Sequence, residues 1–292
     1  MPGIMIEPDG VCIFVTEKCN SNCIMCPMSL QSRQRGLSIP DEEWNSILDN
    51  VPSDISHITI TGGEPFLEYQ NLIPIFEKIN LIMPYADVLV LTNGRALSIK
   101  KIIDQIAPLI TMKYCFAIPI HGSTADLHDS ISQSPGSFSQ SMRALKLLSR
   151  TDAKIEIRIV GHQHNIHDIS EIYRTTVCSG AKIDTINLIA MEMMGCAAAN
   201  RNSLWVPYQS LCEAALPGIQ FAMLHGIDAG LYNFPLCTIP KELWPLAKDS
   251  ITASKVRFDD KCHLCVEKNA CGGLFYSTYL LGLCSIQPIV QE

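Results

Sequence analysis

The sequence lacks any run of eighteen apolar residues, so no membrane-spanning helix is predicted. Only 17% of the 292 residues are charged, and no block of Lys or Arg stands out against a net charge of −7. Nucleic acid is therefore not expected as the main partner. The first residues have no basic region followed by an apolar core, so we expect no signal peptide. Walker, Rossmann and Ser-His-Asp patterns are also missing.

Cysteine, by contrast, is abundant, with 13 in the chain. Without an export signal, this number favours metal binding in a reducing compartment over a disulfide framework, and we expect a cytoplasmic protein. Cys19, Cys23 and Cys26 form a CxxxCxxC triplet directly after a strand-like run. Three thiolates on one short loop can hold three corners of a cubic iron–sulfur cluster and leave one iron open to a small molecule. A zinc finger needs four ligands, so the triplet alone does not predict one.

A second motif, Gly62-Gly63-Glu64-Pro65, follows the strand-like run His57–Thr61. Paired glycines let the backbone approach a ligand closely, because they carry no Cβ. The carboxylate of Glu64 adds an acceptor that suits an ammonium group. This motif therefore predicts a ligand contact at the end of the second strand.

Apolar, β-branched runs alternate with helical patterns, and the hydrophobic content of 47% is enough for one large α/β domain or a domain with an appendage. Repeated β–loop–helix units with right-handed crossovers predict a parallel, barrel-like α/β architecture. In such barrels the chemistry lies at the carboxyl ends of the strands, where both motifs fall. The expected strands are 11–16, 56–61, 87–92, 114–120, 154–160 and 185–190, and the expected helices are 41–48, 71–79, 98–106, 137–148 and 169–178.

The pattern changes beyond residue 200, where a long helix at 205–225 and a strand at 226–232 precede a Pro- and Cys-rich tail. The tail carries a CxxCx5C set, and one more cysteine upstream could supply a fourth thiolate. An iron–sulfur cluster is the leading interpretation, while a small zinc site and free buried thiols remain open. The four tail cysteines are Cys237, Cys262, Cys265 and Cys271. We expect a barrel domain over 1–200 and a helix with a small Cys-rich extension over 201–292.

Together, the CxxxCxxC triplet and the Thr-Gly-Gly-Glu-Pro segment resemble the radical SAM superfamily over about residues 11 to 192. The resemblance implies a partial (βα)6 TIM-like barrel. It also implies that Cys19, Cys23 and Cys26 hold a [4Fe–4S] cluster whose open iron chelates the amino and carboxylate groups of S-adenosylmethionine. One electron, supplied by a reducing protein such as flavodoxin or ferredoxin, would cleave this cofactor to methionine and a 5′-deoxyadenosyl radical that abstracts hydrogen from a substrate.

The same resemblance implies roles for residues at the strand ends. The GGEP segment would bind the methionine amino group, and Arg158 would contact the cofactor carboxylate. Asn93 would lie beside the adenosyl group, and the backbone of Met25 would contact adenine. His121 is expected to contact substrate or cofactor. A solvent-facing Arg158, a plain turn at Asn93 and a structural His121 are the alternatives. The expected cofactor-binding set is Met25, Gly62, Gly63, Glu64, Pro65, Asn93, His121 and Arg158.

The tail resembles half of the SPASM and twitch extensions of radical SAM peptide maturases. Segments 232–237 and 243–251 look like the maturases of His-Xaa-Ser peptide systems, in particular the C-type partner. This implies an auxiliary [4Fe–4S] cluster on the four tail cysteines and a ribosomal precursor peptide that is cross-linked or epimerised. No leader-binding winged module is visible, so the barrel mouth, the tail or a separate partner protein would recognise the peptide.

Two other functions share part of this pattern. A glycyl-radical enzyme activase carries both front motifs but does not need the tail cysteines. An iron–sulfur electron-transfer protein without S-adenosylmethionine chemistry would need only the clusters. Among the remaining residues, Arg33 and Arg35 are expected in a solvated loop and 162–167 in a solvated connection. The cysteines expected in the core are Cys12, Cys115, Cys178, Cys196 and Cys212.

Overall fold

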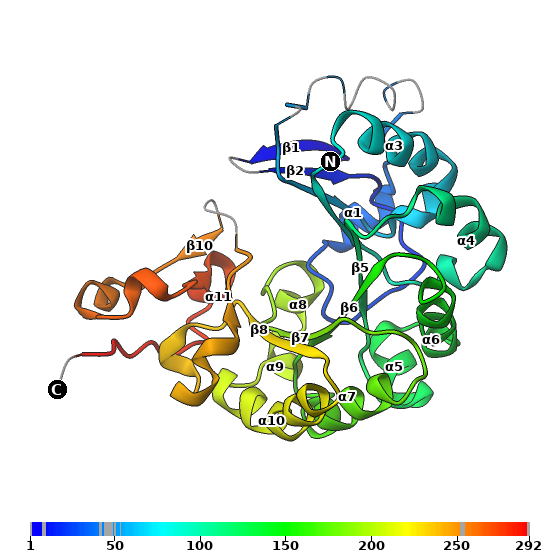
Figure 1. Cartoon of the computed structure of the whole chain (residues 1–292). Helices are drawn as coiled ribbons and strands as arrows, with labels where there is room; N and C mark the ends of the chain where they lie inside the picture. Colours follow the sequence, from blue (N-terminus) through cyan, green and yellow to red (C-terminus); the bar gives the residue numbers. More distant parts are fainter. Residues whose placement is uncertain are drawn as a thin grey trace.

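The computed structural model describes residues 2–7, 10–40, 43, 49, 51–52, 54–251 and 255–290. Its main feature is a nine-stranded sheet in which neighbours follow the chain order from β1 to β9. The strands from β2 to β9 are parallel, and β1 (Gly3–Glu7) pairs antiparallel with β2 (Gly10–Phe14). The sheet curls, with the main helices outside it and the tail beside its open side (Figure 1).

The six predicted parallel strands are confirmed, each to within two residues at either end. They are β2, β3 (His57–Thr61), β4 (Asp87–Leu91), β5 (Tyr114–Pro119), β6 (Lys154–Val160) and β7 (Thr185–Ile189). The α/β class is therefore correct. The sheet extends further than six strands, because β8 (Asp228–Tyr232) and β9 (Ala247–Lys248) continue it in parallel. β1 was not anticipated from the sequence.

The helices on the outside of the sheet follow the apolar periodicity. Helix α3, for example, buries Leu72, Ile75, Phe76 and Ile79, which share one face. The main helices are α3 (Tyr69–Ile82), α4 (Lys100–Ile106), α5 (Ala125–Ser132), α6 (Ser137–Leu148), α7 (Ile169–Val177) and α10 (Tyr208–Leu224). Shorter ones are α1 (Leu30–Arg35), α8 (Gly195–Ala199), α9 (Arg201–Leu204) and α11 (Tyr276–Leu280).

Three helix predictions need comment. The helix expected at 205–225 begins only at Tyr208, because Trp205 and Pro207 are extended and separate it from α9. The helix expected at 98–106 begins at Lys100, after a separate 3₁₀ turn at Ala96–Ser98. The helix expected at 41–48 falls outside the described residues except for Glu43.

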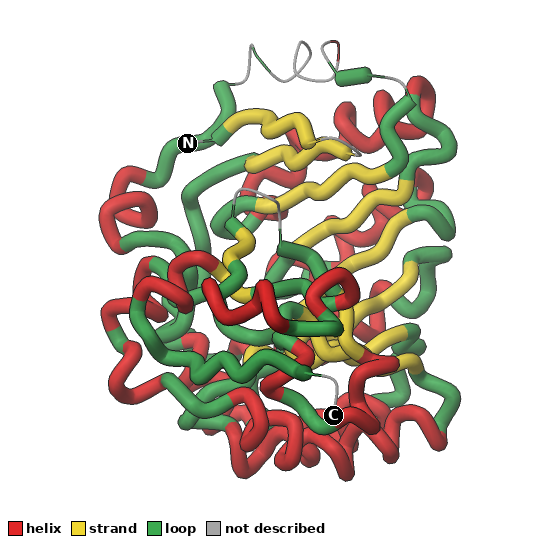
Figure 2. Tube along the Cα trace, turned by 90° about the vertical axis from the view of Figure 1, so that its left-hand side faces the viewer, coloured by secondary structure: helices red, strands yellow, loops and turns green. Residues whose placement is uncertain are grey.

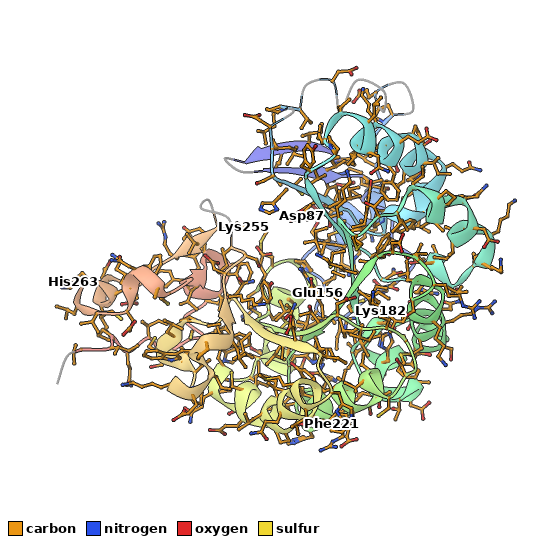
Figure 3. All side chains as sticks on the ribbon, in the orientation of Figure 1. Asp87, Glu156, Lys182, Phe221, Lys255 and His263 are labelled. Atoms are coloured by element: carbon orange, nitrogen blue, oxygen red, sulfur yellow. The ribbon has the colours of Figure 1, made fainter. Side chains whose placement is uncertain are left out.

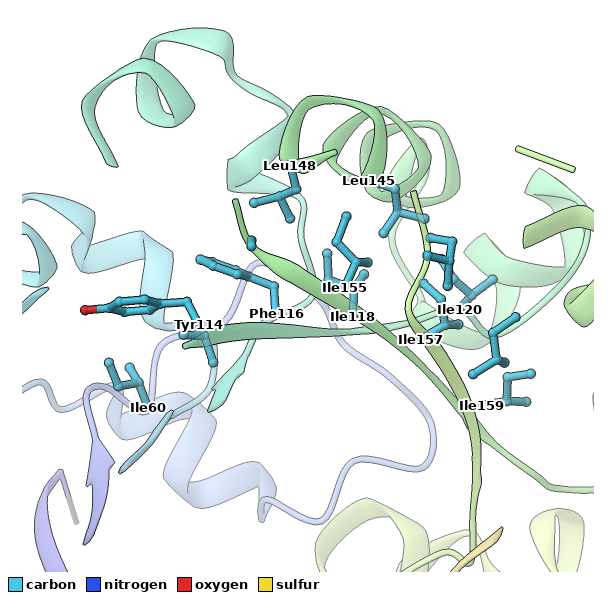
Figure 4. Packing of buried hydrophobic residues seen from close by; sticks show 14 of the residues in the cluster. Ile60, Tyr114, Phe116, Ile118, Ile120, Leu145, Leu148, Ile155, Ile157 and Ile159 are labelled. Carbon is cyan, nitrogen blue, oxygen red and sulfur yellow. The ribbon is translucent and has the colours of Figure 1, made fainter. Parts of the chain in front are cut away.

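The core lies between the sheet and its outer helices (Figure 4). On β6, Ile155, Ile157 and Ile159 are fully buried and belong to one cluster with residues of α6. Burying each of these side chains contributes about 1.5–3 kcal/mol. Because side chains alternate along a strand, Glu156 and Arg158 point to the opposite, inner face of the sheet. Figure 3 shows Glu156 near the centre of the molecule.

The tail packs beside the carboxyl ends of the strands. It contains a small antiparallel pair, β10 (Val256–Arg257) with β11 (Leu274–Phe275). Two contacts connect it to the end of β7: Lys255 Nζ lies 3.2 Å from Glu192 Oε1, and the Thr278 hydroxyl donates to the Met191 carbonyl at 3.5 Å. Figure 2, turned by 90°, shows the parallel strands side by side. Among the described residues, no helix is both long and apolar enough to cross a membrane.

Candidate functional site

The two motifs of the front half lie directly against each other. The N–H of Gly63 donates to the Thr16 carbonyl at 2.6 Å, and the N–H of Glu64 donates to the Lys18 carbonyl at 2.8 Å. A Cβ on Gly62 would lie 2.7 Å from the Thr16 carbonyl oxygen, and one on Gly63 would lie closer still to that of Lys18. Both glycines are therefore required for the contact between the two loops, in addition to any approach of a ligand.

The three thiols of the triplet line one cavity of about 310 Å³ at the carboxyl ends of the strands. Most of the residues expected at the cofactor line the same cavity, whereas Glu64 and Pro65 are not among its lining residues. Besides Cys19, Cys23 and Cys26, the lining includes Met25, Gly62, Gly63, Asn93, His121 and Arg158. The structure thus brings together residues that are up to 139 positions apart in the sequence, from Cys19 to Arg158. Pro65 is buried at the start of a 3₁₀ turn, beside Glu64.

The thiols are surrounded by hydrogen-bond donors. The N–H of Ser21 lies 3.4 Å from Cys19 Sγ, and Asn93 Nδ2 lies 3.8 Å from the same sulfur. His121 Nε2 lies 3.9 Å from Cys23 Sγ. Burial raises the pKa of Cys19 and raises that of Cys23 to about 12. Without a metal, Cys23 is therefore a protonated thiol at neutral pH.

The donor set fits an iron–sulfur cluster better than a single metal ion. Within the described ranges, no group of three or more His, Cys, Asp or Glu side chains is arranged to hold one ion. A cubic cluster bonds each thiolate to a different iron, so its donors need not converge on one point. Three thiols around one cavity, with N–H groups beside the sulfurs of Cys19 and Cys23, match that requirement.

Glu64 ties the end of β3 to the end of β4. Its Oε1 accepts from the N–H of Phe66 at 3.1 Å and from the Thr92 hydroxyl at 2.6 Å, and its Oε2 accepts from the N–H of Asn93 at 2.7 Å. The side chain is fully buried, and this burial raises its pKa above the ordinary value. A carboxylate has about four acceptor positions, so three bonds leave room for one more donor.

Arg95, which sequence reasoning missed, follows β4 and holds the loop of residues 19–26, here called the cluster loop because it carries the Cys triplet. Its guanidinium donates to the Asn20 carbonyl and, at 3.1 Å, to the Ser21 hydroxyl. Asn93 Nδ2 donates to Asn20 Oδ1 at 2.7 Å. The turn expected after β4 is therefore also a support for the loop that carries Cys19. The only sequence signal was its position directly after Asn93-Gly94.

The two arginines after the triplet lie in helix α1, so the expectation of a loop is wrong, although the Arg35 side chain is 47% exposed, as a solvated position requires. Arg35 Nε donates to Glu17 Oε2 at 2.9 Å, and Glu17 is only 2% exposed. The Arg33 guanidinium donates to the Cys23 carbonyl at 3.2 Å and lines the cavity. Arg33 is a second functional residue that the sequence reasoning did not assign.

Buried histidines form one side of the site. His121 follows β5, and His128 lies in helix α5, where its ring is buried and lines the cavity. Burial holds the pKa of His121 well below its ordinary value and lowers that of His128 to about 4. His162 was expected in a solvated connection. This expectation is wrong, because its side chain is fully buried, which lowers its pKa to about 3.

Arg158 reaches the cavity from the inner face of β6. Its Nε donates to Glu156 Oε1 at 2.7 Å, and the side chain is partly exposed. The alternative of a freely solvated arginine does not hold, because Arg158 has a carboxylate partner and lines the cavity. Its contact with a cofactor carboxylate stays a prediction.

The loop after β7 covers the cluster loop. The N–H of Cys196 donates to the Cys26 carbonyl at 2.9 Å, and Asn200 Nδ2 donates to the Ile24 carbonyl at 2.8 Å. Met25 is buried here in a cluster that includes Met191 and Met193. Of the cysteines expected in the core, Cys196 and Cys212 are buried, Cys12 and Cys115 are partly buried, and Cys178 is exposed, so the expectation for Cys178 is wrong.

The four tail cysteines, Cys237, Cys262, Cys265 and Cys271, line a second, mainly apolar pocket. The N–H of Leu236 lies 3.5 Å from Cys271 Sγ, and the N–H of Ile289 lies 3.4 Å from Cys265 Sγ. Burial raises the pKa of Cys237 and of Cys262. Cys284 lines a separate cavity, which also touches Cys237. All thirteen cysteines are free thiols.

Residues 13–176 match the family model of the radical SAM superfamily, which is more than half of the chain. The chain therefore belongs to the radical SAM superfamily, a superfamily of enzymes. The chain is 24% identical over 173 residues to the AdoMet-dependent heme synthase of Methanosarcina barkeri, which covers 57% of this chain and 46% of that protein. It is 20% identical over 199 residues to the PqqA peptide cyclase of Rhodopseudomonas palustris, and this match covers 68% of this chain and 50% of that protein.

Solved structures of Streptococcus suis SuiB have the same fold. The complex of SuiB with its precursor peptide SuiA matches with a TM-score of 0.61 at 14% identity, covering 78% of this chain and 49% of that chain. SuiB bound to S-adenosylmethionine matches equally well, with a TM-score of 0.61 and coverage of 77% and 50%. The chain thus spans about half the length of the relatives it matches.

Proposed function

We propose that this chain is a radical SAM peptide maturase, which cross-links or epimerises a ribosomal precursor peptide after hydrogen abstraction. The observation that carries the proposal is the cavity shared by the three thiols of the triplet, the paired glycines and Arg158. When bound there, a [4Fe–4S] cluster with S-adenosylmethionine supplies the one-electron cleavage that yields a 5′-deoxyadenosyl radical. Family membership and the names of the peptide-modifying relatives support this reading.

The residues of the chain have distinct roles in this proposal. Cys19, Cys23 and Cys26 would hold the cluster and leave its open site to the amino and carboxylate groups of the cofactor. Glu64 offers its remaining acceptor position to the methionine amino group, and Pro65 fixes the turn after the glycines. Arg158, oriented by Glu156, binds the carboxylate.

The wall that surrounds these groups is largely apolar, and it includes Met25, Val160 and Ile189. Such a wall excludes water, which would otherwise quench a reactive intermediate. In this proposal, Asn93 and the backbone of Met25 would contact the adenosyl part. A protein that only transfers electrons has no need for a cavity of this size with converging polar groups, so this alternative is weaker.

The tail cysteines are proposed to hold an auxiliary [4Fe–4S] cluster that binds substrate or accepts the electron left after hydrogen abstraction. Four thiols on one apolar pocket, with two amide N–H groups directed at their sulfurs, support a cluster with four protein ligands. A glycyl-radical activase would have no use for this set. A zinc ion and free buried thiols are the remaining alternatives, although the four thiols, all among the described residues, are not arranged to hold a single ion, and iron and zinc analysis separates the three.

The partners follow from the same proposal. The substrate is a ribosomal precursor peptide, and a flavodoxin or ferredoxin supplies the electron in the cytoplasm. The open side of the sheet, the tail or a separate leader-binding protein would recognise the peptide.

A cluster count tests the proposal most directly. Wild type, a Cys19/Cys23/Cys26→Ala triple variant and a Cys262/Cys265/Cys271→Ala triple variant are reconstituted anaerobically and examined by iron and sulfide analysis and Mössbauer spectroscopy. We expect about eight irons per chain in the wild type and about four in each variant. A wild type with no cluster on the triplet would contradict the proposed function. If the Cys19/Cys23/Cys26→Ala variant contains zinc and no iron, only the proposal of an auxiliary cluster is contradicted.

A further inference from the structure

His121 stands directly beside one of the three triplet thiols. It follows β5, is only 4% exposed, and places Nε2 at 3.9 Å from Cys23 Sγ. The ring also lines the cavity. Among the described side chains, the donor directed at the Cys23 sulfur is this imidazole, whereas Cys19 receives an N–H from Ser21 and an amide from Asn93.

The peptide groups of His121 are held on both sides. Its N–H donates to His128 Nδ1 at 3.1 Å, and its carbonyl accepts from Asn165 Nδ2 at 3.2 Å. Asn165 is itself 1% exposed and also donates to the Val160 carbonyl at 3.0 Å. The two imidazole rings pack with their centroids 5.1 Å apart. This packing restricts the orientation of the His121 ring toward Cys23.

The chemistry of the pair fixes which nitrogen carries the proton. A cysteine that ligates iron is a thiolate and has no proton to donate. The Nε2 of His121 must therefore carry the hydrogen if the two groups are to bond. Its Nδ1 is buried without a hydrogen-bond partner among the described atoms. A bare acceptor at Nδ1 is compatible with the Nε2–H form, in which the ring's single donor points to the sulfur.

We propose that His121 donates its Nε2–H to the Cys23 sulfur of the reactive cluster and thereby raises the reduction potential of that cluster. A hydrogen bond to a ligand sulfur stabilises the more negative, reduced state of an iron–sulfur cluster more than the oxidised one. His121 is then a positioning residue that acts through Cys23. This inference rests on the proposed function, since it requires the cluster on the triplet.

The test uses the full chain, reconstituted anaerobically, as wild type, His121→Ala and His121→Gln. The reactive cluster is followed by electron paramagnetic resonance during a potentiometric titration, and it is identified as the signal that changes when S-adenosylmethionine is added. At the wild-type midpoint, we expect the ratio of reduced to oxidised cluster to fall about tenfold in His121→Ala, which is 59 mV for a one-electron couple. His121→Gln keeps an N–H donor, so its ratio should stay closer to the wild-type value.

A spectroscopic measurement on the wild type makes the test independent of variant folding. After exchange into D₂O, a deuteron coupled to the cluster should be seen by electron–nuclear double resonance, together with a ¹⁵N coupling in protein labelled at histidine. Absence of both couplings overturns the inference, as does a His121→Ala protein with a full cluster and an unchanged potential. A wild type that assembles no cluster on the triplet overturns the proposed function instead, so the two failures are distinguishable.

Discussion

The two cysteine sets of this chain differ in number, surroundings and support. The triplet has three thiols on a large cavity with polar groups, and its loop is held by the side chains of Asn93 and Arg95, which follow β4. The tail set has four thiols on a small apolar pocket, with donors from the backbone only among the bonds described. Under the proposed function, three thiols would leave one coordination site of a cluster for a ligand, whereas four thiols would saturate a cluster with protein ligands.

The difference also lies in how each set depends on the rest of the fold. Besides the local N–H of Ser21, the donors to the triplet are Asn93 and His121, which lie 74 and 98 positions along the chain from the cysteines that they contact. Donors to the tail set, Leu236 and Ile289, lie within the tail region itself. The surroundings of the triplet therefore depend on the assembled sheet, whereas those of the tail set depend mainly on local loops.

The largest effect is expected from removing one thiol of each set. Cys19→Ala should abolish 5′-deoxyadenosine formation, because the cluster with the open iron loses a ligand. Cys262→Ala should retain formation of 5′-deoxyadenosine and lose the modified peptide. Chromatographic assay of both products checks this contrast. Unchanged 5′-deoxyadenosine formation by Cys19→Ala would contradict the assignment of the triplet.

A smaller effect is expected from Glu64→Gln. The substitution removes the charge that would face the methionine amino group and places an amide next to the donors of Thr92 and Asn93. Losing a charged hydrogen bond costs about 1.5–3 kcal/mol, so S-adenosylmethionine should bind roughly ten- to a hundredfold more weakly in calorimetry. Glu68→Gln on the same turn is the matched control and should bind nearly as wild type. Equal losses in both variants would show that the turn, rather than the Glu64 carboxylate, matters.

Cluster assembly should depend on pH because the thiols must lose their protons to bind iron. Burial raises the pKa of Cys23 to about 12, so its thiolate fraction increases with pH throughout the range below that value. We expect the initial rate of reconstitution on the triplet to rise with pH, by at most about tenfold per unit. Stopped-flow absorbance on the tail-cysteine variant, which retains only the triplet, measures it. A rate that is flat between pH 7 and about 9 would contradict protonated thiols as the barrier.

The smallest effect is expected from Trp244→Phe in the tail. Trp244 Nε1 donates to the Leu236 carbonyl at 3.0 Å, and Leu236 in turn bonds the Cys271 sulfur. Losing this bond should cost about 1 kcal/mol of local stability. Hydrogen exchange should then be faster around Leu236 and unchanged in β3 and β4. Faster exchange throughout the sheet would mean that the tail and barrel unfold as one unit.

The parallel strands and both motifs could be predicted because their signals are local. β6, for example, has alternating isoleucines, and the Cys spacing is read within eight residues. The burial of His162 could not be predicted, because it depends on an Asn165 side chain that bonds the His162 N–H and the His121 carbonyl. Without that knowledge, a run of polar residues in a loop predicts a solvent-exposed segment.

Arg33 and Arg35 were misjudged for a related reason. Basic residues after a loop usually face water. Here, however, Arg35 bonds the buried carboxylate of Glu17, and Arg33 donates to the Cys23 carbonyl. Those partners come from the chain segment before the helix, and only the folded loop brings them close. The short edge strand β1 was missed because its sequence, Gly-Ile-Met-Ile-Glu, does not alternate between apolar and polar residues.

The close approach of Gly62 and Gly63 to residues 16–18 has a consequence for how the site could be transferred to another protein. The ligand-binding segment and the cluster loop share main-chain hydrogen bonds and have no side-chain layer between them. Because main-chain hydrogen bonds join the two segments directly, we expect them to move together. A graft that carries the cysteines without the glycines would therefore inherit the ligands of the cluster but not their alignment with the cofactor.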